Sequence, residues 1–341
     1  MQKRRRISYR HNKKFKILVT IVVICMALLV AFLIYKDQMA QGAYKVAEVE
    51  VGEPQQSYSI TYKGEEYDFN SSIESVLLIG VDSRGKLEAQ ENYGVDARAD
   101  NIDLIIMDRQ NQSVKILPIS RDTMTEITKY TVKGYESSSY VDHIGFAFSY
   151  GNGGKASCDN VCDAVSNLLY GIDVRYYICT NLDSIAFAND LLGGVKVECP
   201  NNDLSGKYPE MTEGAKIKLG DSNVEDFLRY RNTDEDYSNN GRMERQQAFL
   251  DGFVEQIKEM SEEDFADMWK ELKSDDSNIL TNVSKSHFLK LINRINEYEY
   301  DSEKSNLKIE GTDKVEDGHD VFYANEKKLK QLVVDTFYDK R

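Results

Sequence analysis

Histidine and cysteine are scarce in this sequence, with four and five copies among 341 residues. No G-x-S-x-G nucleophile elbow and no complete Ser/His/Asp arrangement is present, so nothing points to a serine hydrolase. The cysteine spacing is not completed to four ligands by a second pair or a nearby histidine, which argues against a zinc site. Internal repeats and low-complexity tracts are absent too. The chemistry of the chain must rest on other side chains.

Acidic residues are absent from the first 36 positions, which carry nine lysines and arginines. The remaining 305 residues hold 34 Lys and Arg against 57 Asp and Glu, a net charge of −23. Such a body does not attract nucleic acid non-specifically, because its charge has the same sign as the phosphate backbone. We therefore expect no nucleic-acid partner.

An uncharged apolar run occupies residues 17–35. As a helix it would span roughly 28 Å, close to the apolar core of a bilayer. Eight positive charges precede it and the first acid, Asp37, follows it. The positive-inside rule then predicts a basic cytoplasmic tail at 1–16, a transmembrane anchor at 17–35 and an external remainder. A cleaved signal peptide, cut near residues 40–43, is the alternative, although its apolar core is usually shorter.

Cysteines beyond this run would lie outside the cell, where disulfides are permitted. The four thiols of Cys158, Cys162, Cys179 and Cys199 allow three pairings, and the sequence does not choose among them. Cys158 and Cys162 lie one turn apart on an expected helix, which suits a bridge poorly. Buried free thiols are the favoured interpretation.

Short apolar runs alternate with helical patterns along most of the external region. Predicted buried strands occupy residues 75–81, 102–108, 113–119, 174–180 and 194–200. Predicted helices occupy 156–170, 182–191 and 241–260, with another around residues 224–228 capped by Asp221 or Ser222. The rest is expected to be mainly helical, with a connecting strand near 306–310. This alternation predicts an α/β fold, a three-layer α/β/α sandwich with a central mixed sheet, over residues 71–341. Residues 36–70 should form a stalk, with two short strands at 57–69.

Arginine is rare in the external region and unevenly placed. Residues 37–341 contain 23 lysines but only eleven arginines, and seven of these fall in three short clusters at strand ends or helix starts. The clusters are 81–101 with Arg84 and Arg98, 119–123 with Arg121, and 229–247 with Arg229, Arg231, Arg242 and Arg245. Loops at one edge of an α/β sheet commonly build ligand sites, and a guanidinium can bind two phosphate oxygens at once. The pattern therefore indicates a phosphate site.

Two features sharpen this prediction. Arg242, Arg245 and Gln246 are three and four residues apart at an expected helix start, so we expect them to share one face near its positive end. Asp82 and Asp100 adjoin apolar strands, and such a carboxylate pair suits Mg²⁺, which prefers oxygen ligands. Asp122 could orient Arg121. The alternative is that each arginine pairs with a surface acid and each aspartate serves a turn.

Other polar and aromatic positions give weaker signals. His143 is isolated, and a lone histidine is more often packed or at the surface. Phe146, Phe148 and Tyr150 alternate with small residues and are expected in the core, with an apolar tunnel as the alternative. The glycines at 151–154 do not have the spacing of a nucleotide-binding fingerprint.

Taken together, the clusters resemble the LytR–CpsA–Psr family of membrane-anchored cell-wall ligases, over about residues 72–255. VLLIGVDSR, RADNIDLIIMDR and ISRDT are similar to the first three motifs of that family. IGFAFSYGNGG and LLGGVKV follow in the expected order, and RYRNTDEDYSNNGRMERQQAFL resembles its R-x-R…R-x-x-RQQ pattern. The order and spacing of the set are more specific than any single match.

The resemblance implies transfer of a glycopolymer, a teichoic acid or capsule-type polysaccharide, from a polyprenyl-pyrophosphate carrier to peptidoglycan. It also implies Mg²⁺ at the pyrophosphate, held by Asp82 and Asp100. Catalytic roles are expected for Asp82, Asp100, Arg121 and Asp122, with Asp82 or Asp122 as the proton acceptor. Expected pyrophosphate contacts come from Arg84, Arg98, Arg121, Arg229, Arg231, Arg242, Arg245 and Gln246. An apolar channel between sheet and helices is expected to hold the lipid.

Three departures from the family pattern stand out. Asn101 replaces a usual threonine, and Ser120 replaces a frequent proline. Asn239 and Asn240 lie where the family often has an aspartate, which removes any acid role carried over from there; Asp234 or Asp236 would have to substitute. A non-catalytic surface receptor for phosphorylated polymers or polyprenyl phosphates is the competing function, because it could use the arginines without a metal.

Overall fold

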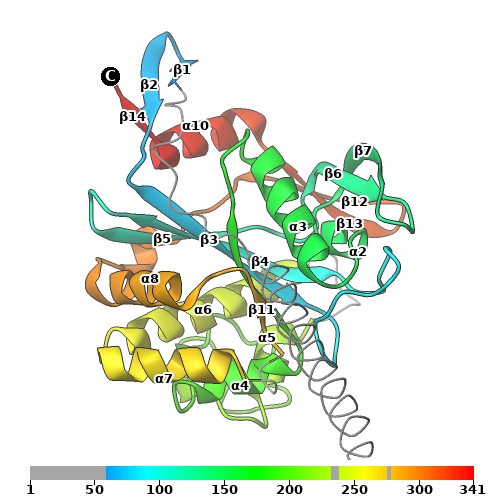
Figure 1. Ribbon diagram of the computed structural model, residues 1–341. Helices are drawn as coiled ribbons and strands as arrows, with labels where there is room; N and C mark the ends of the chain where they lie inside the picture. The colour runs from blue at the N-terminus through cyan, green and yellow to red at the C-terminus, as the bar shows by residue number, and fades with distance from the viewer. Residues whose placement is uncertain (1–58, 232–237, 275–277) are drawn as a thin grey trace, which may run out of the picture. The chain divides into compact units, whose positions relative to one another are not determined.

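The computed structural model describes residues 59–231, 238–274 and 278–341 (Figure 1). The predicted anchor at 17–35, and Asp234 and Asp236, lie outside these residues. Within the described ranges no helix is both long and apolar enough to cross a membrane.

A five-stranded sheet forms the centre of the fold, in the order β11-β8-β3-β4-β5. Its strands are β3 (Ile73–Val81), β4 (Ala99–Asp108), β5 (Ser113–Pro118), β8 (Tyr176–Asn181) and β11 (Leu280–Thr281). β3 and β8 run parallel, whereas the other neighbouring pairs are antiparallel. The predicted mixed α/β fold with a central mixed sheet is therefore confirmed.

Both faces of this sheet are buried, which explains the near-continuous apolar runs of its strands. Side chains of successive strand residues point to opposite faces. Leu77 and Ile106 belong to one apolar cluster, while Val76 and Ile105, their neighbours in the chain, belong to another. An apolar residue at every position is what a sheet covered on both sides requires.

Helices cover the two faces in separate groups (Figure 1). α3 (Lys155–Leu168) and α10 (Glu326–Phe337) contribute to the cluster that contains Leu77. α6 (Asn239–Ile257), α7 (Glu262–Leu272) and α8 (Lys285–Glu297) contribute to the cluster that contains Val76. The predicted helices at 156–170 and 241–260 are thus present, with ends shifted by a few residues.

Four small sheets surround the centre. The two predicted strands at 57–69 are β1 (Ser59–Tyr62) and β2 (Glu65–Phe69), and β2 also pairs with β14 (Tyr338–Lys340). Their connecting residues, Lys63 and Gly64, both have positive φ, as a two-residue hairpin turn requires. The other three pairs are β6 (Met124–Tyr130) with β7 (Glu136–His143), β9 (Lys196–Glu198) with β10 (Lys216–Lys218), and β12 (Gly311–Glu316) with β13 (His319–Ala324).

Several expectations were wrong in detail. The apolar run at 194–200 forms β9, which pairs only with β10 and not with the central sheet. The segment near 306–310 contributes one isolated bridge, Ile116 to Asn306, and the strands β12 and β13 lie in a region expected to be mainly helical.

The predicted capping residue of α5 was wrong as well. α5 (Val224–Arg229) begins after Asn223, and neither Asp221 nor Ser222 caps it. The predicted helix at 182–191 is α4 (Ser184–Asp190). The short helix α2 (Phe146–Ser149) was not foreseen, whereas α9 (Ser302–Ser305) lies in the region expected to be mainly helical. The four cysteines of the described residues are buried free thiols, as expected.

Candidate functional site

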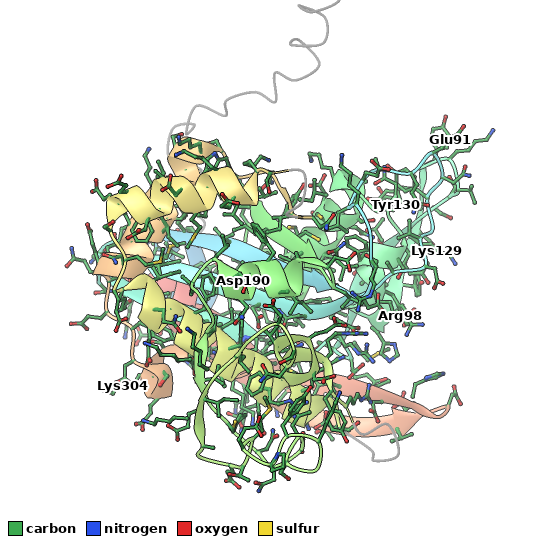
Figure 2. All side chains as sticks on the ribbon, turned by 90° about the horizontal axis from the view of Figure 1, so that it is seen from below. Glu91, Arg98, Lys129, Tyr130, Asp190 and Lys304 are labelled. Carbon is green, nitrogen blue, oxygen red and sulfur yellow. The ribbon has the colours of Figure 1, made fainter. Side chains whose placement is uncertain are left out.

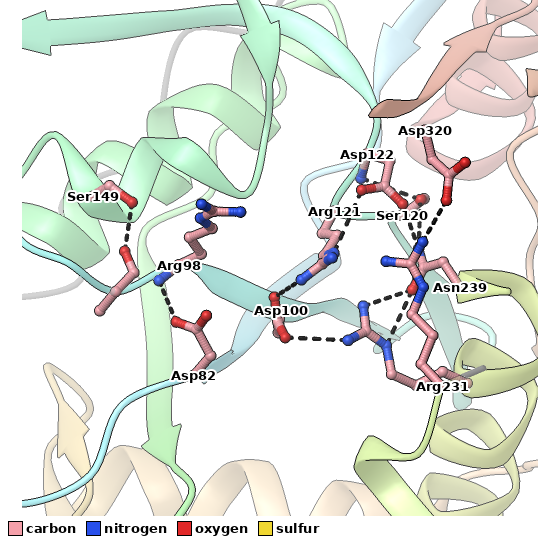
Figure 3. A network of polar contacts seen from close by, with 12 residues as sticks. Asp82, Arg98, Asp100, Ser120, Arg121, Asp122, Ser149, Arg231, Asn239 and Asp320 are labelled. Atoms are coloured by element: carbon pink, nitrogen blue, oxygen red, sulfur yellow. Dashed lines mark hydrogen bonds and ion pairs between the residues drawn. The ribbon is translucent and has the colours of Figure 1, made fainter. Parts of the chain in front are cut away.

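The first two arginine clusters meet because β3 and β4 are antiparallel neighbours. The end of β3 therefore lies beside the start of β4, and the Asp82 carboxylate accepts the backbone N–H of Arg98 at 2.5 Å (Figure 3). The Asp82 N–H in turn donates to the Arg98 carbonyl. This double link fixes Asp82 next to Asp100, two residues further along β4.

Asp100 joins the second and third clusters. β5 is antiparallel to β4, so its C-terminal end brings Arg121 to the start of β4, where Arg121 Nη1 pairs with Asp100 Oδ1. From α6, Arg242 Nη1 donates to Asp100 Oδ2 at 3.1 Å (Figure 3). Residues 21 and 142 positions apart from Asp100 thus share its two oxygens.

Asn239 links Arg242 to Asp122. Its Oδ1 accepts both Nε and Nη2 of Arg242, at 3.1 and 2.6 Å. Its Nδ2 donates to Asp122 Oδ2 at 2.9 Å and to Ser120 Oγ at 3.1 Å. The asparagine that replaces the family's acid therefore works as a buried bridge. Asp122 also lies 3.4 Å from Arg121 Nε, which agrees with an orienting role.

Arg231 is held by a residue that the sequence reasoning missed. Asp320, at the start of β13, forms an ion pair with Arg231 Nη2, while Arg231 Nε donates to Ser238 Oγ at 2.8 Å. The Asp320 carbonyl also lies 3.0 Å from His143 Nε2. No spacing rule could have found Asp320, because it is one of several acids in a segment that resembles none of the quoted motifs.

Burial and neighbouring charges perturb the ionisation of this cluster. Burial raises the pKa of Asp82, and the charge of Asp100 adds to the rise, against the hydrogen bond from the Arg98 backbone. Burial likewise raises the pKa of Asp122 in spite of Arg121, Arg231 and Arg242. Burial, together with the nearby arginines, lowers the pKa of Arg242 to about 10 against the pull of Asp100. For Arg121, Asp100 and Asp122 outweigh burial and raise the pKa.

Not every predicted contact residue lies in this cluster. The exposed Arg84 pairs with Asp183 and Glu225. Arg229 also pairs with Glu225, but it lines the cavity described below. The guanidinium of Arg98 lies 4.7 Å from the centre of the Phe146 ring (Arg98 is labelled in Figure 2).

Arg245 is directed elsewhere, which departs from the expected shared face of Arg242, Arg245 and Gln246. Its Nε donates to the Phe227 carbonyl at 2.9 Å, and the rest of the guanidinium faces Asn201, Asp203 and the Tyr230 carbonyl. Arg242 and Gln246 are four residues apart and both line the cavity, whereas Arg245 is not part of that lining. Four of the five Arg245 N–H groups are occupied by protein oxygens, so the arginine serves to fix the loops before α6.

An apolar cavity of about 280 Å³ opens beside the cluster, between the sheet and α4, α6, α7 and α8. Its polar lining includes Asp100, Asn101, Asp103, Arg229, Arg242 and Gln246. Along β4 the lining then becomes apolar at Ile105 and Met107. At the rise per residue of a β-strand, the part of the lining from Asp100 to Met107 extends over roughly 24 Å. The site thus combines a charged end with a long apolar interior. Phe146, Phe148 and Tyr150 do not line this cavity; they pack with the cluster on the opposite face of the sheet.

Gly145 contacts the backbone of both segments that carry site residues Arg121 and Asp100. Its N–H donates to the Arg121 carbonyl and its carbonyl accepts the Ala99 N–H, so it bridges the segments that carry Arg121 and Asp100. A Cβ at this position would lie 2.9 Å from the Ala99 carbonyl oxygen and 3.3 Å from Arg121 Cβ. Glycine is needed here for this close approach.

The two site aspartates fit a divalent cation in one respect. They are close enough for the charge of Asp100 to raise the pKa of Asp82, and both offer carboxylate oxygens. No group of three or more His, Cys, Asp or Glu side chains suited to a metal occurs in the described part of the chain. A cation here would need water or ligand oxygens to complete its coordination, which is how Mg²⁺ commonly binds.

Comparisons with known proteins agree with this architecture. The teichoic acid transferase TagU of Bacillus licheniformis (polyisoprenyl-teichoic acid–peptidoglycan teichoic acid transferase) is 27% identical over 212 residues, 62% of this chain and 60% of that protein. TagU of Halalkalibacterium halodurans is 28% identical over 187 residues, 55% of this chain and 54% of that protein. The chain thus matches little more than half the length of these relatives.

Solved structures share the fold. Bacillus subtilis TagV superposes with a TM-score of 0.59 at 20% identity, covering 78% of this chain and 97% of TagV. A structure of TagT bound to LIIa-WTA superposes with a TM-score of 0.57 at 21% identity, covering 84% of this chain and 98% of TagT. The model of the LytR_cpsA_psr family matches residues 36–336. The chain therefore belongs to the LytR_cpsA_psr family.

Proposed function

We propose that this protein is a phosphotransferase that moves a glycopolymer from a polyprenyl-pyrophosphate carrier to peptidoglycan. The observation that carries the proposal is the convergence of Arg121, Arg231 and Arg242 beside the charged end of an apolar cavity. A pyrophosphate joined to an isoprenoid has the same two parts, an anionic head and an apolar tail. The names of the TagU relatives support a teichoic acid, and a capsule-type polysaccharide is the other polymer we consider.

In this proposal a sugar hydroxyl of peptidoglycan attacks the phosphorus next to the polymer. The bond between that phosphorus and the bridging oxygen breaks, and polyprenyl phosphate leaves with the electron pair. Arg121, Arg231 and Arg242 would hold the phosphate oxygens and stabilise the charge that grows on the leaving group. Arg121 and Arg242 are held by Asp100, and Arg231 by Asp320, so little reorganisation is needed when the ligand arrives.

The hydroxyl proton needs an acceptor, and the two aspartates considered for this role differ. Both oxygens of Asp122 already face donors, Oδ1 the Arg121 guanidinium and Oδ2 the Asn239 amide. Asp82 forms no ion pair with any residue that the structure describes, and only its Oδ1 accepts a hydrogen bond, from Arg98. Burial raises the pKa of both aspartates, so the difference between them lies in these contacts. We therefore assign proton acceptance to Asp82, through the carboxylate oxygen that does not hold the cation proposed below.

A divalent cation would supply the additional positive charge that a bound pyrophosphate needs at this site. The cluster contains three arginines, Arg121, Arg231 and Arg242, but four aspartates, Asp82, Asp100, Asp122 and Asp320. A pyrophosphate would therefore enter a site without excess positive charge. Mg²⁺ held by Asp82 and Asp100 would supply Lewis-acid stabilisation of the phosphate charge when bound. We propose Mg²⁺ as the cofactor on these grounds.

The anchor predicted at 17–35 would tether the protein to the cell membrane that holds the lipid carrier. In that arrangement the N-terminus is cytoplasmic and the transferase region external. Membrane association would keep the carrier's head group within reach of the arginines.

The test uses purified full-length protein in detergent with a polyprenyl-pyrophosphate-linked glycan and peptidoglycan fragments, and it measures released polyprenyl phosphate. Arg231→Lys keeps the charge but loses the two-point fork, so ligand binding should weaken by roughly 1–3 kcal/mol. Arg341→Lys, in an exposed ion pair with Asp68, is the matched control and should behave as wild type. Tight binding without any release would favour the receptor, and wild-type binding by Arg231→Lys would remove Arg231 from the site.

A further inference from the structure

Asp103 is a buried carboxyl group that the proposed mechanism does not use. It lies on β4 with only 4% of its surface exposed, and it lines the apolar cavity. Asn101 Nδ2 donates to Asp103 Oδ2 at 2.5 Å, which is the only hydrogen bond of this carboxyl group with the residues that the structure describes. The neighbouring lining positions on the same face of β4 are Ile105 and Met107. An acid therefore stands where the cavity changes from polar to apolar.

The charged groups nearest to Asp103 do not pair with it. Asp100 and Arg121 line a second, small cavity together with Asp103, of about 10 Å³, which is room for about one water molecule. Arg242 of α6 and Arg229 at the end of α5 line the main cavity. Each of these four residues has an ion pair elsewhere in the site or at its rim. Nothing compensates a negative charge on Asp103 except one amide.

A carboxyl in this position favours its neutral form. Burial raises the pKa of Asp103 to about 7, with the Asn101 hydrogen bond opposing the rise. The neutral form carries an O–H donor, and the Asp103 carboxyl group has no hydrogen bond to an acceptor among the described residues. A ligand with oxygen atoms at the polar end of the cavity would supply one.

We propose that neutral Asp103 donates a hydrogen bond to the phosphate nearest the lipid in an isoprenyl pyrophosphate, which makes it a specificity-determining residue for lipid phosphates. The inference rests on the proposed function, because it assumes that the head group lies beside Asp100 and Arg121. Ionised Asp103 would repel the same phosphate. A ligand tail without phosphate cannot form this hydrogen bond, so Asp103 should not increase its affinity.

Affinity for an isoprenyl pyrophosphate should therefore fall as the pH rises through neutrality. Between about pH 6 and about pH 8.5 we expect a loss of about ten- to a hundredfold, the scale of one hydrogen bond to a charged group. Asp103→Asn keeps a donor of the same size without the charge, so its affinity should change much less. The ligand's own phosphates ionise over the same range, and the difference between wild type and Asp103→Asn removes that contribution.

The experiment titrates farnesyl pyrophosphate into full-length protein in detergent with chelator, at several pH values, with farnesol as the probe that lacks phosphate. A steep loss in wild type, a shallow one in Asp103→Asn and no pH dependence for farnesol support the inference. Parallel curves for wild type and Asp103→Asn would overturn it while leaving the proposed function intact. Failure of wild type to bind farnesyl pyrophosphate at any pH, both in chelator and with added Mg²⁺, would overturn both.

A second readout does not depend on the variant's affinity. A protonated carboxyl has an infrared C=O band distinct from that of a carboxylate, and Asp103→Asn identifies the band that belongs to Asp103. The inference requires this band below neutral pH, and it requires the band to shift when farnesyl pyrophosphate binds. A band that is absent below neutrality, or that ignores the ligand, contradicts it.

Discussion

At the scale of single residues, Asp82 and Asp100 have the same side chain but opposite surroundings. Asp100 shares its two oxygens between Arg121 and Arg242, and the Arg242 side chain is only 6% exposed. Asp82 meets a single backbone N–H, and burial and the charge of Asp100 disfavour its ionised form. Neutralising the two carboxylates should therefore have different consequences for stability, even though the sequence analysis predicted them as one carboxylate pair.

Asp100→Asn should lower the free energy of unfolding by roughly 1–3 kcal/mol, because the buried Arg242 loses its charged partner. Asp82→Asn should leave the thermal midpoint unchanged or raise it, because it removes a carboxylate whose ionised form the fold disfavours. Both should abolish Mg²⁺-dependent release of polyprenyl phosphate. Thermal unfolding at neutral pH and the release assay check the prediction; equal destabilisation by the two substitutions would contradict it, as would full turnover by either.

Asp103 gives a prediction about stability and pH. Its pKa is about 7 in the fold against 3.8 in the unfolded chain, so its contribution to stability is present at low pH and is lost as the pH rises towards 7. Asp103→Asn should then raise the free energy of unfolding by on the order of 1–4 kcal/mol at about pH 8, and much less at about pH 4. Denaturant unfolding at both pH values measures this, with Asp313→Asn on the exposed strand β12 as the control. A pH-independent effect would mean that Asp103 is ionised in the fold.

At the scale of elements, burial decides what could be predicted. β3 and β4 carry near-continuous apolar runs because both of their faces are covered, and these runs predicted both strands. β12 is exposed at every position and β7 at most positions, so no burial pattern marks them as strands. β9 is apolar too, but it packs with Phe227 and Phe249 in a third cluster away from the central sheet. An apolar run predicts a buried strand without saying which sheet contains it.

The same limit applies to the site. Local clustering predicted that Arg121, Arg231 and Arg242 would gather with Asp82 and Asp100. It could not predict which arginine faces which acid, because Asp320 lies 89 positions from Arg231 and reaches it only through the β12–β13 hairpin. Nor could spacing alone predict that Arg245 binds the Phe227 carbonyl and does not line the cavity with Arg242.

The β12–β13 hairpin should therefore matter for binding although it carries no recognised motif. Asp320→Asn removes the charge that holds Arg231 and should weaken binding of farnesyl pyrophosphate about tenfold, because the guanidinium is no longer fixed. Asp313→Asn, in the same hairpin but exposed, is the matched control. Titration of both variants with the pyrophosphate, together with their thermal midpoints, checks the prediction. Unchanged or tighter binding by Asp320→Asn would show that Asp320 competes with the ligand for Arg231.

At the scale of the whole molecule, charge is segregated along the chain. The first 36 residues carry nine positive charges and no acid, while the rest has a net charge of −23. The anionic lipid head group must therefore approach a body of like charge, and the arginine cluster is the place where that repulsion is relieved. Added salt screens the negative charge of residues 37–341, because charges interact over only about 8–10 Å at physiological ionic strength. The protein should therefore meet its lipid carrier faster when salt is added.

The same segregation predicts the orientation of the protein in the cell. Eight cations precede the apolar run at 17–35, so residues 1–16 should stay in the cytoplasm and residues 37–341 should be external. Protease added to intact protoplasts should then digest the large region, while a tag at the N-terminus remains protected until the membrane is permeabilised. Protection of the large region would reverse the orientation. A mature N-terminus near residue 43, found by N-terminal sequencing, would replace the anchor with a cleaved signal peptide and would separate the site from direct attachment to the membrane that holds its carrier.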